Sequence, residues 1–146
     1  MNNYMEISFD SNSINEGLAR IAVSGFTVQL NPTIEELADI KTAVSEAVTN
    51  SIVHGYDDKV GKVTIKCTYD DEKVLAITVS DDGKGIQNIQ KAMQPFYTSK
   101  PNMDRSGMGF TVMETFMDEI KVESSVGVGT KVTMIKKIES VKNECQ

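Results

Sequence analysis

Two polar residues, Glu46 and Asn50, lie four positions apart in a segment with a helical apolar pattern. Residues at this spacing share one face of a helix, a turn from each other. An amide oxygen is a hard ligand that Mg²⁺ accepts together with phosphate oxygens, so Asn50 is the candidate magnesium ligand. Glu46 is then the candidate catalytic base, because its carboxylate is placed to accept the proton of an attacking hydroxyl.

Three glycine-paired turns follow this pair, at residues 81–85, 106–110 and 127–130. Such turns let the main chain take positive φ, approach a ligand closely and present N–H groups to phosphates. Any one of them alone is weak evidence, because Asp and Gly are common in plain turns. Their order behind an acidic and amide helix predicts an ATP site.

Within the first turn, Asp81 ends an apolar strand pattern and precedes Gly83 and Gly85. Its carboxylate could accept a hydrogen bond from an exocyclic amine, which favours adenine over guanine. Asp82 is better explained as a turn residue.

The second turn directly precedes a helical pattern, so Gly107 and Gly109 would expose free N–H groups at a helix start, which is an anion site. Arg105 adds a positive charge for a β- or γ-phosphate. Thr98 and Lys100 in the same loop are weaker candidates, and solvation explains Lys100 equally well.

The pattern of the whole chain predicts the elements that must position these residues. Helices are expected over 12–30, 34–54 and 108–118, with a short one at 88–93, and strands over 4–9, 63–69, 74–80, 119–124 and 130–137. The four-residue link 70–73 suits an antiparallel hairpin. These elements predict one domain over 1–146, an α+β two-layer sandwich with helices on one face of a mixed, mostly antiparallel sheet, and a frayed tail at 138–146.

The apolar spacing also predicts which side chains are buried. The expected inward residues are Ile14, Leu18, Ile21 and Phe26 in the first helix, Ile34, Leu37, Ile40, Val44, Ala47, Val48 and Ile52 in the second, and Phe110, Val112, Met113, Phe116 and Met117 in the third.

Composition narrows the function classes. The net charge of −6 argues against general binding to nucleic acid or to a membrane surface. Cys67 and Cys145 have neither metal spacing nor the look of a disulfide framework, which suits a reducing compartment, and no signal peptide is apparent. We therefore expect a cytoplasmic protein. The P-loop and the eukaryotic-type protein kinase motifs are absent, so another ATP fold is needed.

Residues 46–50, 81–85, 95–100, 106–110 and 127–130 resemble, in this order, the N, G1, F, G2 and G3 boxes of the GHKL ATPases, which include gyrase and histidine kinases. The resemblance implies the Bergerat ATP-binding fold, binding of ATP or ADP with Mg²⁺, and magnesium coordination by Asn50. The nucleotide contacts that it implies are Asn50, Asp81, Gly83, Gly85, Ile86, Thr98, Arg105, Ser106, Gly107, Met108, Gly109, Phe110 and Thr130. Phe110 stands where leucine is usual.

With residues 15–20 included, the chain is similar to the anti-sigma F factors of endospore-forming bacteria. That likeness implies a dimeric serine kinase that sequesters a sporulation sigma factor and phosphorylates a small anti-anti-sigma protein, with Arg20 on the partner-binding face. Glu46 stands where histidine kinases have asparagine, and resembles the gyrase glutamate that serves a hydroxyl nucleophile. A catalytically silent ATP-dependent binding module and a detached histidine-kinase catalytic domain remain as alternatives.

Overall fold

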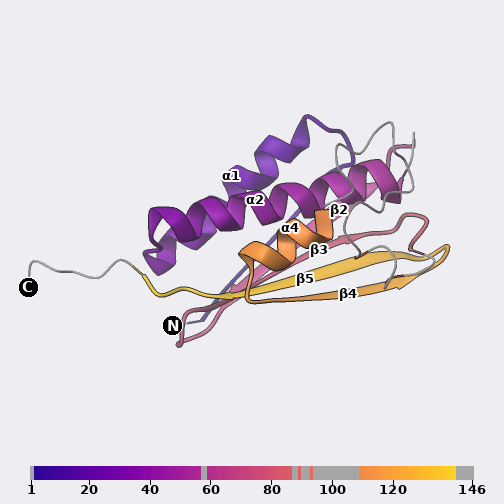
Figure 1. Ribbon diagram of the computed structural model, residues 1–146. Coiled ribbons are helices and arrows are strands. Elements are labelled where there is room, and N and C mark those ends of the chain that lie inside the picture. Colours follow the sequence, from indigo (N-terminus) through magenta and orange to yellow (C-terminus); the bar gives the residue numbers. More distant parts are fainter. Residues whose placement is uncertain (1, 57–58, 87–88, 90–92, 94–108, 141–146) are drawn as a thin grey trace, which may run out of the picture.

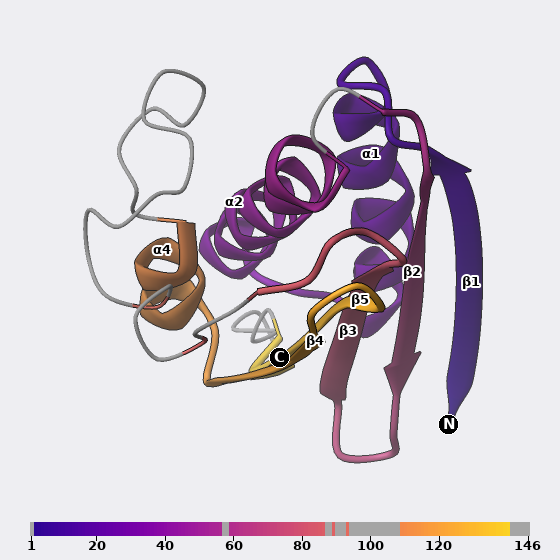
Figure 2. The ribbon, with the colours of Figure 1, turned by 90° about the vertical axis from the view of Figure 1, so that its right-hand side faces the viewer.

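The computed structural model describes residues 2–56, 59–86, 89, 93 and 109–140. In this part of the chain, three α-helices lie over one face of a five-stranded sheet (Figures 1 and 2). The helices are α1 (Asn15–Thr27), α2 (Ile34–Asn50) and α4 (Gly109–Phe116), and the strands are β1 (Asn3–Asp10), β2 (Lys62–Tyr69), β3 (Val74–Asp81), β4 (Glu119–Ser125) and β5 (Gly129–Lys137). The predicted two-layer α+β sandwich is confirmed. The short helix expected at 88–93 falls mostly outside the described residues.

The sheet has the order β1-β2-β3-β5-β4, and each of its four pairings is antiparallel. Among the described strands it is therefore antiparallel throughout rather than mixed. The register pairs Asp81 with Val63 on one side and with Thr130 on the other. The end of the central strand β3 is thus held between two neighbours, which fixes the position of Asp81.

Helix α2 begins at a well-defined N-terminal cap. Thr33 accepts a hydrogen bond from the Glu36 backbone N–H at 3.0 Å, and the Glu36 carboxylate accepts one from the Thr33 N–H at 2.9 Å, which is a capping box. At the other end the helix does not stop at Asn50. It continues as a π-helical turn, η2 (Ser51–Gly55), so the expected helix to residue 54 is present with a changed hydrogen-bond pattern.

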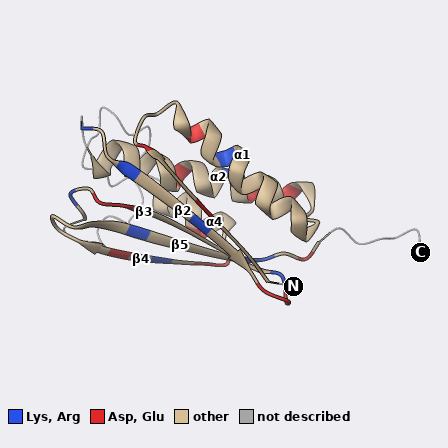
Figure 3. Cartoon of the chain, turned by 180° about the vertical axis from the view of Figure 1, so that it is seen from behind, with Lys and Arg blue, Asp and Glu red and all other residues tan. Residues whose placement is uncertain are grey.

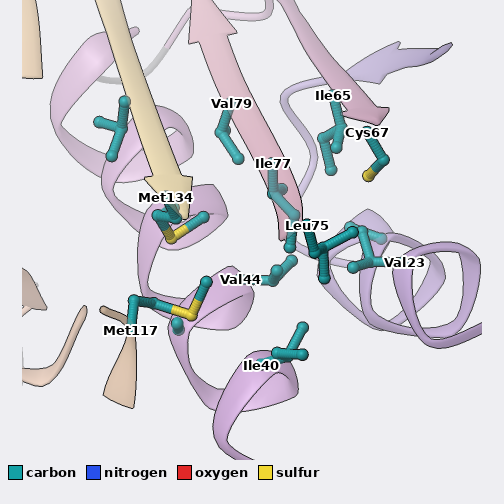
Figure 4. Packing of buried hydrophobic residues seen from close by; sticks show 14 of the residues in the cluster. Val23, Ile40, Val44, Ile65, Cys67, Leu75, Ile77, Val79, Met117 and Met134 are labelled. Atoms are coloured by element: carbon teal, nitrogen blue, oxygen red, sulfur yellow. The ribbon is translucent and has the colours of Figure 1, made fainter. Parts of the chain in front are cut away.

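The core lies between the helices and the inner face of the sheet. Figure 4 shows Ile40 and Val44 of α2 directed toward Leu75 and Ile77 of β3. The expected inward residues of α2 are buried from Ile40 to Val48, but Ile34 is 91% exposed, because it lies in the first turn, beyond the edge of the core.

The predicted stripe of α1 is wrong for three of its four residues. Ile14, Leu18 and Ile21 are 79%, 52% and 73% exposed. The buried face of α1 is instead made by Ala19, Val23, Phe26 and Thr27. Apart from Phe26, this buried face is made of small and β-branched residues, and the aliphatic side chains of Ile14, Leu18 and Ile21 lie on the outer side.

The tail does not begin at Ile138, as was expected. Ile138 is 2% exposed, and its N–H donates to the Lys73 carbonyl at 2.9 Å. The Ser140 hydroxyl donates to the Leu30 carbonyl at 2.7 Å and accepts from the Lys73 ammonium at 2.7 Å. Residues 138–140 therefore close the end of the molecule where α2 begins, which we call the far end.

Candidate functional site

The end of the predicted N-box helix and the start of α4 meet at the opposite end of α2. A Cβ added to Gly109, the first residue of α4, would lie 2.9 Å from the Asn50 side-chain nitrogen. The Asn50 amide is thus packed against the start of α4. We call this end of the molecule, where α2, η2, the end of β3, the β4–β5 turn and α4 come together, the site end.

Asp81 is the most unusual side chain there, because it is a carboxylate only 7% exposed. One carboxylate oxygen accepts a hydrogen bond from the Gly83 N–H at 2.9 Å. The Ser51 hydroxyl and the Thr130 N–H also donate to the Asp81 carboxylate. Burial raises the pKa of Asp81, and these donors, which act in the opposite direction, only partly offset it. A desolvated carboxylate of this kind is suited to accept a hydrogen bond from a ligand.

The first glycine turn is packed directly on the end of η2. A Cβ on Gly83 would collide with the Gly55 carbonyl oxygen, so only glycine permits this approach. The Gly55 carbonyl in turn accepts the Lys84 N–H at 2.8 Å. The turn after β3 is therefore fixed by the helix that carries Asn50.

The first and third glycine turns are also joined to each other. The Lys84 carbonyl accepts the Gly127 N–H at 2.8 Å, and Gly85, with φ of 79°, lies against the Ser125 carbonyl. The Ile86 N–H donates to the Ser124 hydroxyl at 2.6 Å. Two turns about forty residues apart in sequence thus pack against each other through their backbones.

Two further candidates at this end have distinct positions. The Thr130 hydroxyl lies 2.8 Å from the Ser124 hydroxyl, beside Asp81 in the ladder. Phe110 is 8% exposed and belongs to the hydrophobic core, so its ring packs the start of α4 rather than standing free.

Glu46 is half-buried on α2, one helical turn before Asn50. Arg20 lies apart from these residues, on α1, where its guanidinium is 3.1 Å from the Glu16 carboxylate. Its side chain is 44% exposed, which suits a surface contact rather than a nucleotide contact.

Five predicted nucleotide contacts lie outside the described residues: Thr98, Arg105, Ser106, Gly107 and Met108. The weaker candidate Lys100 lies there as well. The described part of the candidate site is thus Asn50, Asp81, the first and third glycine turns and the start of α4.

Sequence reasoning missed Ser51 and Gly55, although both touch the Asp81 region. They lie one and five residues after Asn50, and in a regular helix of 3.6 residues per turn neither position would share the face of Asn50. The sequence therefore gave only a weak indication that they belong to the site. The π-helical turn changes the direction of these residues, and π-turns of this kind are frequent at functional sites.

No group of three or more His, Cys, Asp or Glu side chains that could hold a metal ion occurs among the described residues. The Asn50 amide oxygen could hold a magnesium ion together with phosphate oxygens, since Mg²⁺ accepts few protein ligands.

The Lys, Arg, Asp and Glu residues are dispersed over helices and strands in the view of Figure 3. None of the described helices has the length and apolar character needed to cross a bilayer.

Comparison with known proteins gives consistent results. Residues 13–136 match the histidine kinase-like ATPase domain family. The chain is 57% identical over 137 residues to the anti-sigma F factor of Clostridium acetobutylicum, covering 94% of this chain and 95% of the relative. It is 58% identical over 140 residues to the anti-sigma F factor of a Thermoanaerobacter species, covering 96% and 97%.

Solved structures support the fold. The RsbU and RsbW domains of a Mycobacterium tuberculosis protein align with a TM-score of 0.67 at 19% identity, over 93% of this chain and 32% of that one. The histidine kinase domain of a blue-light activated kinase from Erythrobacter litoralis aligns with a TM-score of 0.57 at 21% identity, over 86% and 60%.

Proposed function

Because this chain belongs to the anti-sigma F factor family of histidine kinase-like ATPase domains, we propose that it binds and inhibits a sporulation sigma factor and acts as an ATP-dependent protein serine kinase. Its kinase substrate is a small anti-anti-sigma protein. The observation that carries the proposal is the meeting of Asn50, Asp81, the first and third glycine turns and the start of α4 at one end of α2. We place this activity in the cytoplasm, where sigma factors act.

The adenine amine donates to the Asp81 carboxylate, and the phosphates lie toward Asn50 and the start of α4. Asn50 would hold Mg²⁺ together with phosphate oxygens, and the ion would supply neutralisation of the phosphate charge. The serine hydroxyl of the partner attacks the γ-phosphorus, its proton passes to the Glu46 carboxylate, and the bond from the γ-phosphorus to the bridging oxygen breaks. The products are phosphoserine and ADP. General-base help of this kind is worth on the order of a hundred- to ten-thousand-fold in rate.

The direct test uses the full chain with Mg-ATP and a purified anti-anti-sigma protein. Intact-mass analysis is expected to show one added phosphoryl group on the partner, stable to acid. A catalytically silent binding module would leave the partner unmodified while its affinity still depended on nucleotide. An acid-labile phosphohistidine would instead support a detached histidine-kinase domain.

The outer face of α1 supports the proposal of a homodimer. Ile14, Leu18, Ile21 and Val28 are all more than half exposed, and with Gly25 they follow a spacing of four and three residues. This is the spacing of a helix seam that packs against another helix. A second copy of the chain is the occupant that we propose. Light scattering of Ile21→Glu is expected to show monomers, whereas dimers at the wild-type ratio would contradict the assignment.

Arg20 is the proposed contact for acidic groups of a partner protein. Its ion-pair partner Glu16 also lines a cleft of about 250 Å³ between α1 and the end of α2, together with Thr49, which precedes Asn50. A partner held at Arg20 can therefore extend toward the catalytic end. Arg20→Glu is expected to weaken sigma-factor binding at least tenfold without changing ATP affinity. Lys41→Glu, which makes the same charge change at an exposed position of α2, is the matched control.

A further inference from the structure

Tyr56, the residue directly after η2, is not used by the proposed mechanism. Its side chain is half-buried, and its hydroxyl has two backbone partners. It accepts the Asp82 N–H at 2.7 Å and donates to the Lys62 carbonyl at 2.5 Å. A donor and an acceptor from two different chain segments are thus joined through one hydroxyl group.

The position of this bridge is informative. The β2–β3 ladder has Val63 opposite Asp81 as its last pair, so Lys62 and Asp82 are the next residues on each side. The Tyr56 hydroxyl therefore takes the place of the next rung of the ladder. It links the two strands where the chain leaves β3 to form the first glycine turn.

The ring itself rests on a fixed support. A Cβ on Gly61 would collide with the Tyr56 ring, so the ring lies directly on the Gly61 backbone. Gly61 is held in turn by Ser11, whose hydroxyl accepts the Gly61 N–H at 2.8 Å and whose own N–H donates to the Gly61 carbonyl at 2.8 Å. This packing fixes the position of the Tyr56 hydroxyl relative to Asp82 and Lys62.

Together, two adjacent residues hold the turn on both sides of Gly83. Tyr56 binds the Asp82 N–H, and the Gly55 carbonyl accepts the Lys84 N–H. The Gly83 N–H between them donates to the Asp81 carboxylate at 2.9 Å. The direction of that carboxylate therefore depends on where the turn is fixed.

We propose that Tyr56 is a positioning residue for base recognition, whose hydroxyl fixes the turn after Asp81 so that the carboxylate meets the exocyclic amine of adenine. This inference rests on the proposed nucleotide site. The proposal predicts that loss of the Tyr56 hydroxyl reduces the preference for adenine more than it reduces binding of the phosphates. The reason is that this hydroxyl lies on the proposed adenine side of the site.

The test is Tyr56→Phe, which removes only the hydroxyl, with binding of ATP and ITP measured by calorimetry in the presence of Mg²⁺. ITP carries a carbonyl where ATP has the amine. The variant is expected to bind ATP about fivefold more weakly and ITP nearly as wild type, since one neutral hydrogen bond is worth roughly a factor of two to ten. Tyr4→Phe is the matched control, because Tyr4 is exposed and its hydroxyl donates to the Glu6 carboxylate, on the outer strand β1.

The outcomes separate the two proposals. If the wild-type protein bound neither nucleotide, the proposed function would fail. If the wild type preferred ATP and Tyr56→Phe kept the same ATP-to-ITP ratio, the assignment to Tyr56 would be overturned, whatever the change in thermal stability. Should Tyr56→Phe not fold, Gly61→Ala shifts the ring from its support and is expected to lower the same ratio, and an unchanged ratio in that variant would equally overturn the assignment.

Discussion

The two ends of α2 each hold an acidic side chain among hydrogen-bond donors, yet the pKa values of these acids shift in opposite directions. At the far end, burial tends to raise the pKa of Glu36, but the N–H groups of Thr33 and Glu139 outweigh it and the pKa is lowered. At the site end, burial dominates and raises the pKa of Asp81. Figure 1 shows these ends at opposite extremes of the long helix. The 17 residues of α2, at 1.5 Å per residue, separate the two ends by about 25 Å.

The two ends differ in what their acidic side chains contribute, stability at the far end and a candidate ligand contact at the site end. The Glu36 carboxylate is better stabilised in the folded chain than in the unfolded one, so it contributes to stability. Burial raises the pKa of Asp81, so its ionised form costs more free energy in the folded chain than in the unfolded one, which is typical of residues retained for ligand binding. Substitutions of the two acids should therefore change the pH dependence of the free energy of unfolding in opposite directions.

The largest expected difference is in phosphoryl transfer. Glu46→Gln is expected to lower the rate of transfer by at least a hundredfold while leaving ATP affinity within about twofold, because only the base is lost. Glu36→Gln is the matched change on the same helix and is expected to leave the rate unchanged. Single-turnover transfer to the partner measures both. A Glu46→Gln variant with wild-type rate would remove the residue from the mechanism.

A smaller difference is expected in nucleotide affinity. Asp81→Asn is expected to weaken ATP binding by about ten- to a hundredfold, since a hydrogen bond to a charged acceptor is worth roughly 1.5–3 kcal/mol. Calorimetric titration checks this. Glu36→Gln again provides the control at the far end, and equal ATP affinity in both variants would break the comparison.

At the far end the expected loss is in stability. Ser140→Ala leaves the Leu30 carbonyl without its 2.7 Å donor and is expected to lower the free energy of unfolding by roughly 1–2 kcal/mol. Urea unfolding measures it. Ser8→Ala, on the exposed face of β1, is expected to cost less, and ATP affinity should stay unchanged in both variants. A loss of ATP affinity in Ser140→Ala would show that the ends are coupled.

The smallest effect is in the pH dependence of stability. The Asp81 pKa is raised on folding, so its contribution to stability is present at low pH and is lost as pH rises through the folded pKa. The Glu36 pKa is lowered, so its contribution is present at higher pH and is lost as pH falls through the folded pKa. Urea unfolding of the wild type, Asp81→Asn and Glu36→Gln between about pH 3 and pH 7 should give difference curves of opposite slope. Parallel curves would contradict the assignment.

The sequence alone determined the features that depend on local pattern. The hairpin expected over 63–80, the amphipathic α2 with Ile40, Val44 and Val48 inward, and the order of the glycine turns all follow from spacing and backbone preference. Resemblance then supplied the family and the list of candidate contacts. Asn50, Asp81 and Gly83 were named without any knowledge of their surroundings.

Only the tertiary structure decided which face of α1 is buried and which residues complete the site. Ile14, Leu18 and Ile21 have the spacing of a core stripe, but the close packing of α1 on α2 excludes them. The contacts of Ser51 and Tyr56 depend on a π-helical turn and on a strand register, which join residues far apart in the chain. Periodicity reports only that one side of an element is apolar, whereas the partner against which that side packs is set by the rest of the fold.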